Sequence, residues 1–154
     1  VLYGGIILTS EGPKVIEFNA RWGDPETQTV LPRLQSDLMD LYMATTDGTV
    51  DETTVQWSEE ACVGVVLASG GYPGDYKTGF PINGLDGLDD GVSVFHAGTR
   101  KSNCGNISAP ITAGGRVLTV TATGTSVEQA RQRTYNNVTR ITFENAEYRT
   151  DIAR

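Results

Sequence analysis

Three polar residues, Glu17, Asn19 and Arg21, follow one another at every second position of the segment 15–26. Successive side chains of a β-strand point to opposite faces, so these three share one face if the strand continues that far. The backbones of Glu17 and Asn19 would then lie about 7 Å apart, which lets a carboxylate and an amide oxygen converge on one hard cation. Magnesium suits such a pair because it takes its remaining ligands from water and nucleotide phosphates. Arg21 could hold an anionic substrate or a transferred phosphoryl group with two hydrogen bonds.

The same alternation has a second interpretation, in which the three residues form the solvated face of an ordinary edge strand. In the first interpretation Ile16 and Phe18 face the core, and Val15 lies at an edge. The spacing alone does not decide between the two, so the elements that would position these residues matter.

The first part of the chain is predicted to form a β-hairpin followed by helices. Residues 1–8 are apolar and residues 14–18 alternate, with turn-forming residues at 11–13 between them. After the break at Gly23-Asp24-Pro25, residues 26–34 suit a short helical piece and residues 37–46 a longer helix. The polar stretch that follows lacks periodicity and is the best candidate for a domain boundary.

The second part is predicted to be a small α+β domain of mostly antiparallel strands with a covering helix. The turn before the last strand is expected at Gly114-Gly115. Ser126 and Gln129 form a capping box that begins the helix. We expect strands at 61–68, 92–95, 107–111 and 117–123. We expect one face of the helix to carry Val127, Ala130, Val138 and Ile141.

Composition excludes two classes of partner. The chain has 154 residues, 38% of them hydrophobic and 20% charged, with a formal net charge of −7. Nucleic-acid-binding proteins gather Lys and Arg into patches, and none is visible here. No apolar run approaches the roughly 20 residues that cross a bilayer, and the first ten residues lack the features of a secretory signal. We therefore expect neither a nucleic-acid nor a membrane partner.

The remaining reactive residue types predict little chemistry of their own. Cys62 lies in an apolar run, where a thiol acts as a small hydrophobe, and we expect Cys62 and Cys104 to be reduced in a cytoplasmic protein. The lone His96 has no evident Ser or Cys partner and is predicted to be structural. The glycine-rich segment 70–74 lacks the spacing of a Walker or dinucleotide loop and is predicted to be a tight loop, although it could face a substrate cleft.

The whole segment around Glu17 is more specific than its alternation. It reads V-I-E-F-N-A-R-W-G-D-P-E-T-Q and resembles the signature of the phosphoribosylamine-glycine ligase family (glycinamide ribonucleotide synthetases) of the ATP-grasp superfamily. The resemblance continues in family order through Leu31-Pro32-Arg33-Leu34, Ser36-Asp37-Leu38, Gly70-Gly71-Tyr72-Pro73-Gly74-Asp75-Tyr76, Phe95-His96-Ala97-Gly98-Thr99, Gly114-Gly115-Arg116-Val117-Leu118 and Arg149-Thr150-Asp151-Ile152.

The resemblance implies an organisation and a reaction. Residues 1–47 would be the carboxy-terminal part of an ATP-grasp domain, 48–58 a linker, and 59–154 the carboxy-terminal glycinamide ribonucleotide synthetase domain. The family joins phosphoribosylamine to glycine with ATP in de novo purine biosynthesis. It forms glycinamide ribonucleotide, ADP and phosphate by way of a glycyl phosphate.

The resemblance also assigns residues. Glu17 and Asn19 match the Mg²⁺ or Mn²⁺ ligands that hold the nucleotide phosphates. From charge and placement we expect Arg21 near the transferring phosphoryl group and Asp24 near an amine, as catalytic residues. Many superfamily members carry a further acidic ligand on the preceding strand, whereas this sequence has Leu2-Tyr3-Gly4-Gly5 there.

The chain is expected to be a fragment that lacks the amino-terminal domains of the same enzyme and is inactive alone. Two alternatives stay open. One is a non-catalytic interaction module that keeps the ligase fold, and the other is a different ATP-grasp carboxylate-amine ligase. The G-D-P-E segment and the motif at 70–76 argue against the second.

Overall fold

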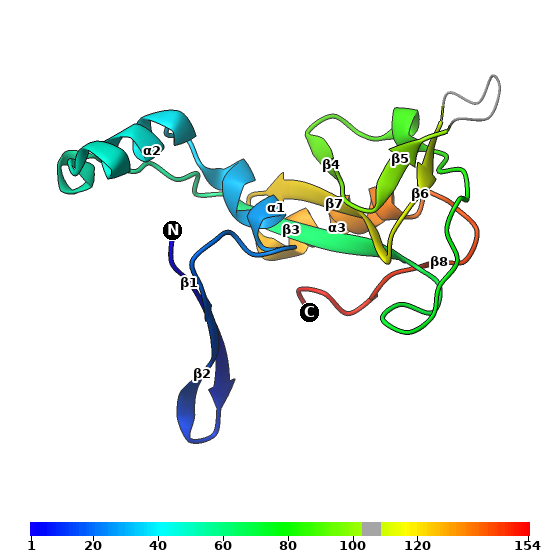
Figure 1. The fold of residues 1–154 in the computed structure, drawn as a ribbon, viewed down its shortest axis with the longest axis horizontal. Helices are drawn as coiled ribbons and strands as arrows, with labels where there is room; N and C mark the ends of the chain where they lie inside the picture. Colours follow the sequence, from blue (N-terminus) through cyan, green and yellow to red (C-terminus); the bar gives the residue numbers. More distant parts are fainter. Residues whose placement is uncertain (103–108) are drawn as a thin grey trace.

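The second part of the chain builds a four-stranded antiparallel sheet, from which a hairpin and a helix of the first part extend (Figure 1). The computed structural model describes residues 1–102 and 109–154. The strand order of the sheet is β4-β7-β3-β8. Its strands are β3 (Ala61–Ser69), β4 (Val92–His96), β7 (Arg116–Gly124) and β8 (Ala146–Glu147). This mixed architecture confirms the predicted α+β class.

One face of the sheet forms the core against α3 (Val127–Val138). Burial alternates along β3, where Val65 and Leu67 are fully buried and pack in one cluster with Val138 of the helix. The alternate residues Gly64, Val66 and Ala68 lie on the opposite face. A Cβ at Gly64 would meet the methyl group of Thr29, so the short helix α1 (Thr27–Val30) covers part of that second face.

The start of α3 is capped as predicted, with a shift of one residue in one contact. The hydroxyl of Ser126 accepts a hydrogen bond from the backbone N–H of Gln129 at 3.2 Å. The Gln129 side-chain oxygen reaches back to the backbone N–H of Thr125, at 2.7 Å, rather than to that of Ser126. Ala130, Val138 and Ile141 are buried, but Val127 is 53% exposed, so its assignment to the core face was wrong. A residue in the first turn can still point past the sheet when the helix end overhangs it.

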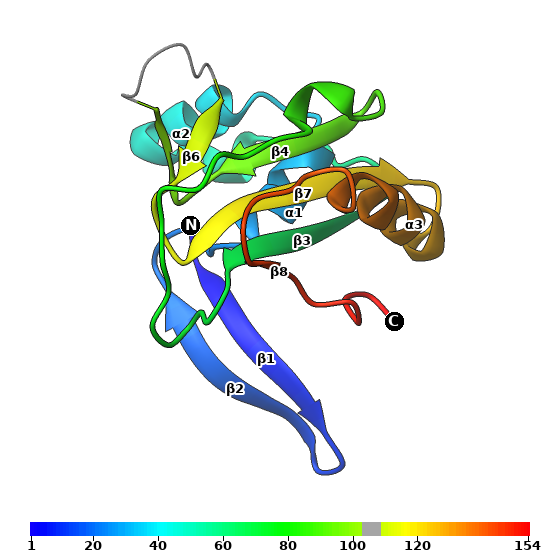
Figure 2. The same ribbon diagram turned by 90° about the vertical axis from the view of Figure 1, so that its right-hand side faces the viewer.

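The hairpin consists of β1 (Tyr3–Thr9) and β2 (Gly12–Asn19), which confirms the predicted pairing. It projects away from the central sheet in both ribbon views (Figures 1 and 2). Ile16 and Phe18 are each 66% exposed, so the prediction that they face a core is wrong for the described residues. Alternation defines two faces of a strand but does not say what covers them.

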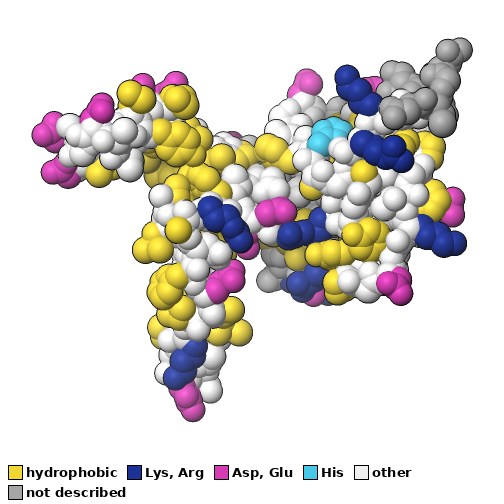
Figure 3. All heavy atoms as spheres, viewed as in Figure 1, with side chains coloured by type: hydrophobic (Ala, Val, Ile, Leu, Met, Phe, Trp, Pro, Cys, Tyr) yellow, Lys and Arg dark blue, Asp and Glu magenta, His cyan; other side chains and the backbone are white. Residues whose placement is uncertain are grey.

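The helical region after the hairpin also follows the sequence. Besides α1 it contains a 3-10 turn (Leu31–Arg33), α2 (Leu38–Asp47) and a second 3-10 turn (Val50–Glu52). The Asp37 carboxylate accepts a hydrogen bond from the N–H of Met39 at 2.7 Å and caps α2, which ends at Gly48 in the left-handed conformation, with φ 74°. Helix α2 extends from the sheet domain (Figure 1). Hydrophobic side chains gather on the visible surface of α2 and the hairpin (Figure 3).

A separate two-stranded sheet pairs β5 (Thr99–Lys101) with β6 (Pro110–Thr112). The strand predicted at 107–111 therefore begins later among the described residues, and Cys104 lies outside them. Gly114-Gly115 is not a hairpin turn, because β6 pairs with β5 whereas β7 pairs with β3 and β4. Turn residues mark a change of direction without fixing the partner of the next strand. A third 3-10 turn spans Leu85–Gly87.

None of the helices in residues 1–102 and 109–154 is both long enough and apolar enough to cross a membrane.

Candidate functional site

Glu17 and Asn19 lie two residues apart in the last regular part of β2. Glu17 pairs with Gly5 and Asn19 with Tyr3 across the hairpin, and the register shift lies between Gly5 and Ile6. The pairing is regular on the Tyr3–Gly5 side of this shift, where both residues lie. Their side chains therefore share one face of the strand. Neither side chain makes a hydrogen bond or ion pair with the described residues. Their oxygen atoms are therefore available to a ligand.

The residues opposite on β1 shape this face. A Cβ at Gly5 would lie 3.2 Å from Cγ of Glu17, so glycine leaves room for the glutamate side chain. The pKa of the Tyr3 hydroxyl is raised by desolvation, then by the charge of Glu26 and a hydrogen bond with it, and by the charge of Glu17. Tyr3, Glu17 and Glu26 thus gather at the base of the hairpin. The sequence analysis missed Tyr3, which only the pairing register could have identified.

The side-chain oxygens of Glu17 and Asn19 suit a divalent cation but are too few to complete its coordination shell. The residues that the structure describes contain no group of three or more His, Cys, Asp and Glu side chains that could hold a metal ion. Glu17 and Asn19 would therefore offer one carboxylate and one amide oxygen. Such a partial set suits a hard ion that keeps water and phosphate ligands, and does not suit a closed structural site.

Arg21 lies beyond the end of β2, so the strand does not carry it onto the face of Glu17 and Asn19. Its guanidinium donates a hydrogen bond to the carbonyl oxygen of Trp22 at 3.0 Å. Within the described part of the chain, no interaction joins Arg21 to Glu17, Asn19 or Asp24. Arg21 was expected on that face only if the strand continued to residue 21, and this condition is not met, because β2 ends at Asn19 and the chain turns toward α1.

Asp24 is held by residues from two other elements. Arg116, at the start of β7, donates a hydrogen bond to the Asp24 carbonyl oxygen at 2.8 Å and forms an ion pair with its carboxylate at 3.3 Å. The side-chain amide of Gln28 donates to the other carboxylate oxygen at 2.8 Å. These contacts hold the Asp24 side chain against the sheet domain. Arg116 belongs to the Gly114–Leu118 motif, but no spacing in the sequence indicated its partner.

Asp24 opens into a pocket of about 330 Å³ between the first and second parts of the chain. His96, at the end of β4, also lines this pocket and shares a 3.0 Å hydrogen bond with the Thr99 hydroxyl. The pocket is lined by Trp22, Gly23, Asp24, Thr27, Gln28, Leu31, Phe95 and His96. Aromatic and aliphatic side chains (Trp22, Leu31 and Phe95) therefore line it together with polar ones (Asp24, Thr27, Gln28 and His96), a mixture that a small polar molecule could fill.

Comparison with protein families matches both parts of the chain. Residues 62–154 match the family described as phosphoribosylglycinamide synthetase, C domain. Residues 1–27 match its ATP-grasp (A) domain. The two matches follow one another in the order that the sequence motifs implied.

Curated proteins and a solved structure agree with these matches. The chain is 45% identical to the phosphoribosylamine–glycine ligase of Halalkalibacterium halodurans over 99% of its own length and 34% of that protein. It is 50% identical to the Streptomyces coelicolor ligase over 99% of its own length and 37% of that protein. The crystal structure of the Thermotoga maritima ligase superposes with a TM-score of 0.73 at 29% identity, over 97% of this chain and 36% of that one.

The chain thus spans about a third of the length of the relatives it matches. The match to the C domain covers more than half of its residues, and the ATP-grasp match contains Glu17, Asn19, Arg21 and Asp24. The chain belongs to the phosphoribosylglycinamide synthetase family.

Proposed function

We propose that this chain provides the metal-binding strand and the carboxy-terminal domain of an ATP-dependent ligase that joins phosphoribosylamine and glycine. Residues 1–47 then complete an ATP-grasp domain, residues 48–58 link the two parts, and residues 59–154 form the carboxy-terminal domain. The family matches to residues 1–27 and 62–154 support this division.

In the proposed reaction the glycine carboxylate attacks the γ-phosphorus of ATP, which forms glycyl phosphate and releases ADP. The amine of phosphoribosylamine then attacks the acyl carbon and displaces phosphate, and the amine loses a proton. Neither step needs a side-chain nucleophile. Phosphoryl transfer depends mainly on positioning and on neutralisation of charge.

The observation that carries the proposal is the pair Glu17 and Asn19 on one face of β2, with no described partner of their own. In this proposal they hold Mg²⁺ or Mn²⁺, which supplies positive charge to the nucleotide phosphates. Arg21 binds the transferring phosphoryl group, and Asp24, held in place by Arg116 and Gln28, binds the incoming amine. A cytoplasmic location belongs to the proposal, in agreement with the free thiol of Cys62.

The direct test is Glu17→Ala in the complete enzyme, with glycine-dependent ADP release as the readout. The expected result is a loss of turnover by orders of magnitude, with a higher requirement for the divalent metal. The matched control is Glu11→Ala, which removes an exposed acid from the turn of the same hairpin and should leave turnover unchanged. Near-normal activity of Glu17→Ala would refute the assignment.

A further inference from the structure

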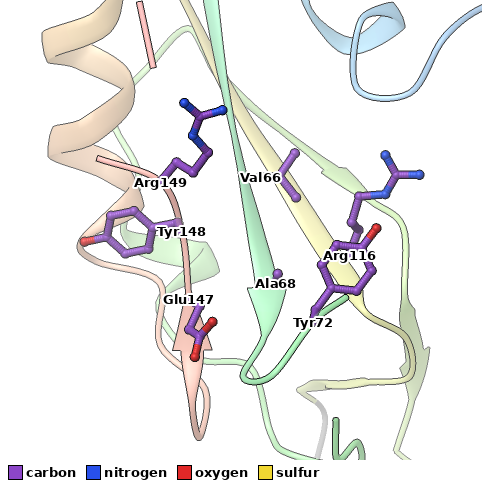
Figure 4. A pocket seen from close by; sticks show the side chains of 7 residues that line it. All are labelled: Val66, Ala68, Tyr72, Arg116, Glu147, Tyr148 and Arg149. Atoms are coloured by element: carbon purple, nitrogen blue, oxygen red, sulfur yellow. The ribbon is translucent and has the colours of Figure 1, made fainter. Parts of the chain in front are cut away.

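Residues 148–154 follow β8 without regular secondary structure and supply part of the wall of two pockets. The first pocket, of about 360 Å³, has Val66 of β3 and Arg149 among its lining residues (Figure 4). The second, of about 210 Å³, shares these two residues and reaches Pro25, the residue after Asp24. Since no strand pairing fixes the segment that carries Arg149, other contacts must set its position.

The segment lies at the edge of the central sheet, beyond β8 in the order β4-β7-β3-β8. The ring of Tyr148 packs against that of Tyr135 on α3, with ring centroids 6.5 Å apart. The next side chain, that of Arg149, lies between the segment and β3 (Figure 4). Neighbouring residues of the segment therefore connect α3, on one side of the sheet, with the wall of pockets on the other.

Tyr135 bonds to the main chain of the segment at two points. Its hydroxyl donates a hydrogen bond to the carbonyl oxygen of Arg149 at 2.7 Å. The same hydroxyl accepts one from the backbone N–H of Ile152 at 3.2 Å. One side chain of α3 thus ties together two peptide groups that no strand pairs.

Arg131 lies four residues before Tyr135, so the two side chains are neighbours on the surface of α3. Its guanidinium donates from Nε to the carbonyl oxygen of Ile152 at 3.0 Å and from Nη2 to that of Thr150 at 3.1 Å. The guanidinium also lies over the Tyr135 ring, 4.8 Å from its centroid. The two residues therefore act as one unit that bonds the main chain of residues 149–152.

The side chain of Arg149 has its described partner within the same segment. Its guanidinium donates to both carboxylate oxygens of Asp151, from Nε at 2.9 Å and from Nη2 at 2.8 Å. Within residues 1–102 and 109–154 it makes no other hydrogen bond or ion pair. The guanidinium therefore moves with the segment, and the bonds from α3 to the main chain decide where it lies.

We infer that Tyr135 and Arg131 are positioning residues of the proposed ligase, which act through the main chain of residues 149–152. They keep Arg149 at the pocket that reaches Pro25, although they extend from a helix on the opposite side of the sheet. The inference rests on the proposed function, in which Asp24 binds the incoming amine. Without these bonds the segment samples other positions, and the substrate beside Asp24 loses a cationic neighbour.

Hydrogen–deuterium exchange in the complete enzyme tests the hold on the segment without turnover. Tyr135→Phe removes the hydroxyl and keeps the ring, so the amides of residues 149–152 should exchange about fivefold faster or more. The amides of α3 and β3 should exchange as in the wild type. Thr139→Val is the control, because it removes a hydroxyl hydrogen bond at the C-terminal cap of α3 and should leave residues 149–152 unchanged. Unchanged exchange in Tyr135→Phe overturns the inference.

Kinetics then test what the hold does for the reaction. Tyr135→Phe should raise the KM for phosphoribosylamine about fivefold and leave kcat, the KM values for ATP and glycine and the melting temperature close to those of the wild type. Arg131→Ala should have the same selective effect. Arg131→Lys should recover part of the loss, since it keeps the charge but has one nitrogen in place of two.

The outcomes separate this inference from the proposed function. A merely structural role would lower the melting temperature and change all three KM values together, and that result contradicts the inference. Faster exchange with an unchanged KM for phosphoribosylamine contradicts it as well. A wild-type enzyme that releases no ADP refutes the proposed function, whereas the exchange measurement decides in either case whether Tyr135 holds residues 149–152.

Discussion

Arg116 of β7 donates a hydrogen bond of 2.8 Å to the main-chain carbonyl oxygen of Asp24, 92 residues earlier in the chain. The same guanidinium pairs with the Asp24 carboxylate at 3.3 Å. One arginine therefore joins the turn after the hairpin to the sheet of the second part. Asp24 and the pockets beside it depend on this contact for their relative position.

Replacement of Arg116 by alanine should reduce activity more than stability. The ion pair is partly exposed, with 40% and 45% of the two side chains accessible, so its loss should cost about 0–1 kcal/mol of unfolding free energy. The turn that carries Asp24 would lose its anchor, and we expect kcat/KM of the complete enzyme to fall at least tenfold. Arg116→Lys should recover only part of it, because Arg116 makes these two contacts from two different nitrogens and lysine has a single one in place of that rigid fork. A large fall in melting temperature with unchanged kcat/KM would contradict this role.

Gly84→Ala should destabilise the second part of the chain. Gly84 has φ +86°, and a Cβ there would overlap the carbonyl oxygen of Arg140. We expect a loss of more than about 1 kcal/mol of unfolding free energy, measured by urea denaturation. Gly87→Ala is the control, because a Cβ at Gly87 would meet nothing within 4 Å. Equal midpoints for the two variants would show that the backbone conformation at Gly84 carries no such cost.

Asp89 should make stability depend on acid pH. Hydrogen bonds from Arg140 first, and then from Asn137, lower the pKa of its carboxyl group below the ordinary value of 3.8. A lowered pKa in the folded state means stabilisation that is present above the ordinary value and lost as the pH falls through the lowered one. Asp89→Asn should therefore have a lower melting temperature than the wild type at pH 7. The difference should shrink below pH 3.8.

Thermal unfolding measured between pH 2 and pH 7 checks this prediction, with the neighbouring Asp90→Asn as the control. A difference between wild type and Asp89→Asn that stays constant through the acid range would contradict it.

Much of the fold is visible in the sequence because local signals and burial agree there. The apolar run that forms β3, the turn between β1 and β2 and the Ser126 cap each correspond to one element of the structure. The sequence analysis failed where a long-range partner decides the outcome. Gly114-Gly115 looks like a hairpin turn, but β7 pairs with strands that precede β6.

The site shows the same limit. Glu17 and Asn19 could be placed on one face because period-two alternation is local. Arg21 could not be placed, because the end of β2 at Asn19 is set by the turn toward α1. Arg116 and Arg149 could not be connected to Asp24 or Val66, since only the folded chain brings these distant segments together.

The 154-residue chain by itself should bind Mg-ATP weakly and release no ADP. It spans about a third of the length of its relatives, and the described residues offer only one carboxylate and one amide on the proposed metal face. Isothermal titration with Mg-ATP and an assay for glycine-dependent ADP release check this expectation. Tight binding together with turnover by this chain would contradict it.

The most direct measurement of the central claim is a crystal structure of the complete enzyme with Mn²⁺ and a non-hydrolysable ATP analogue. The anomalous scattering of manganese locates the ion independently of any assumption about its ligands. The account predicts a peak within about 2.0–2.6 Å of a carboxylate oxygen of Glu17 and the amide oxygen of Asn19. A manganese ion bound to the nucleotide phosphates with neither side chain among its ligands would contradict it.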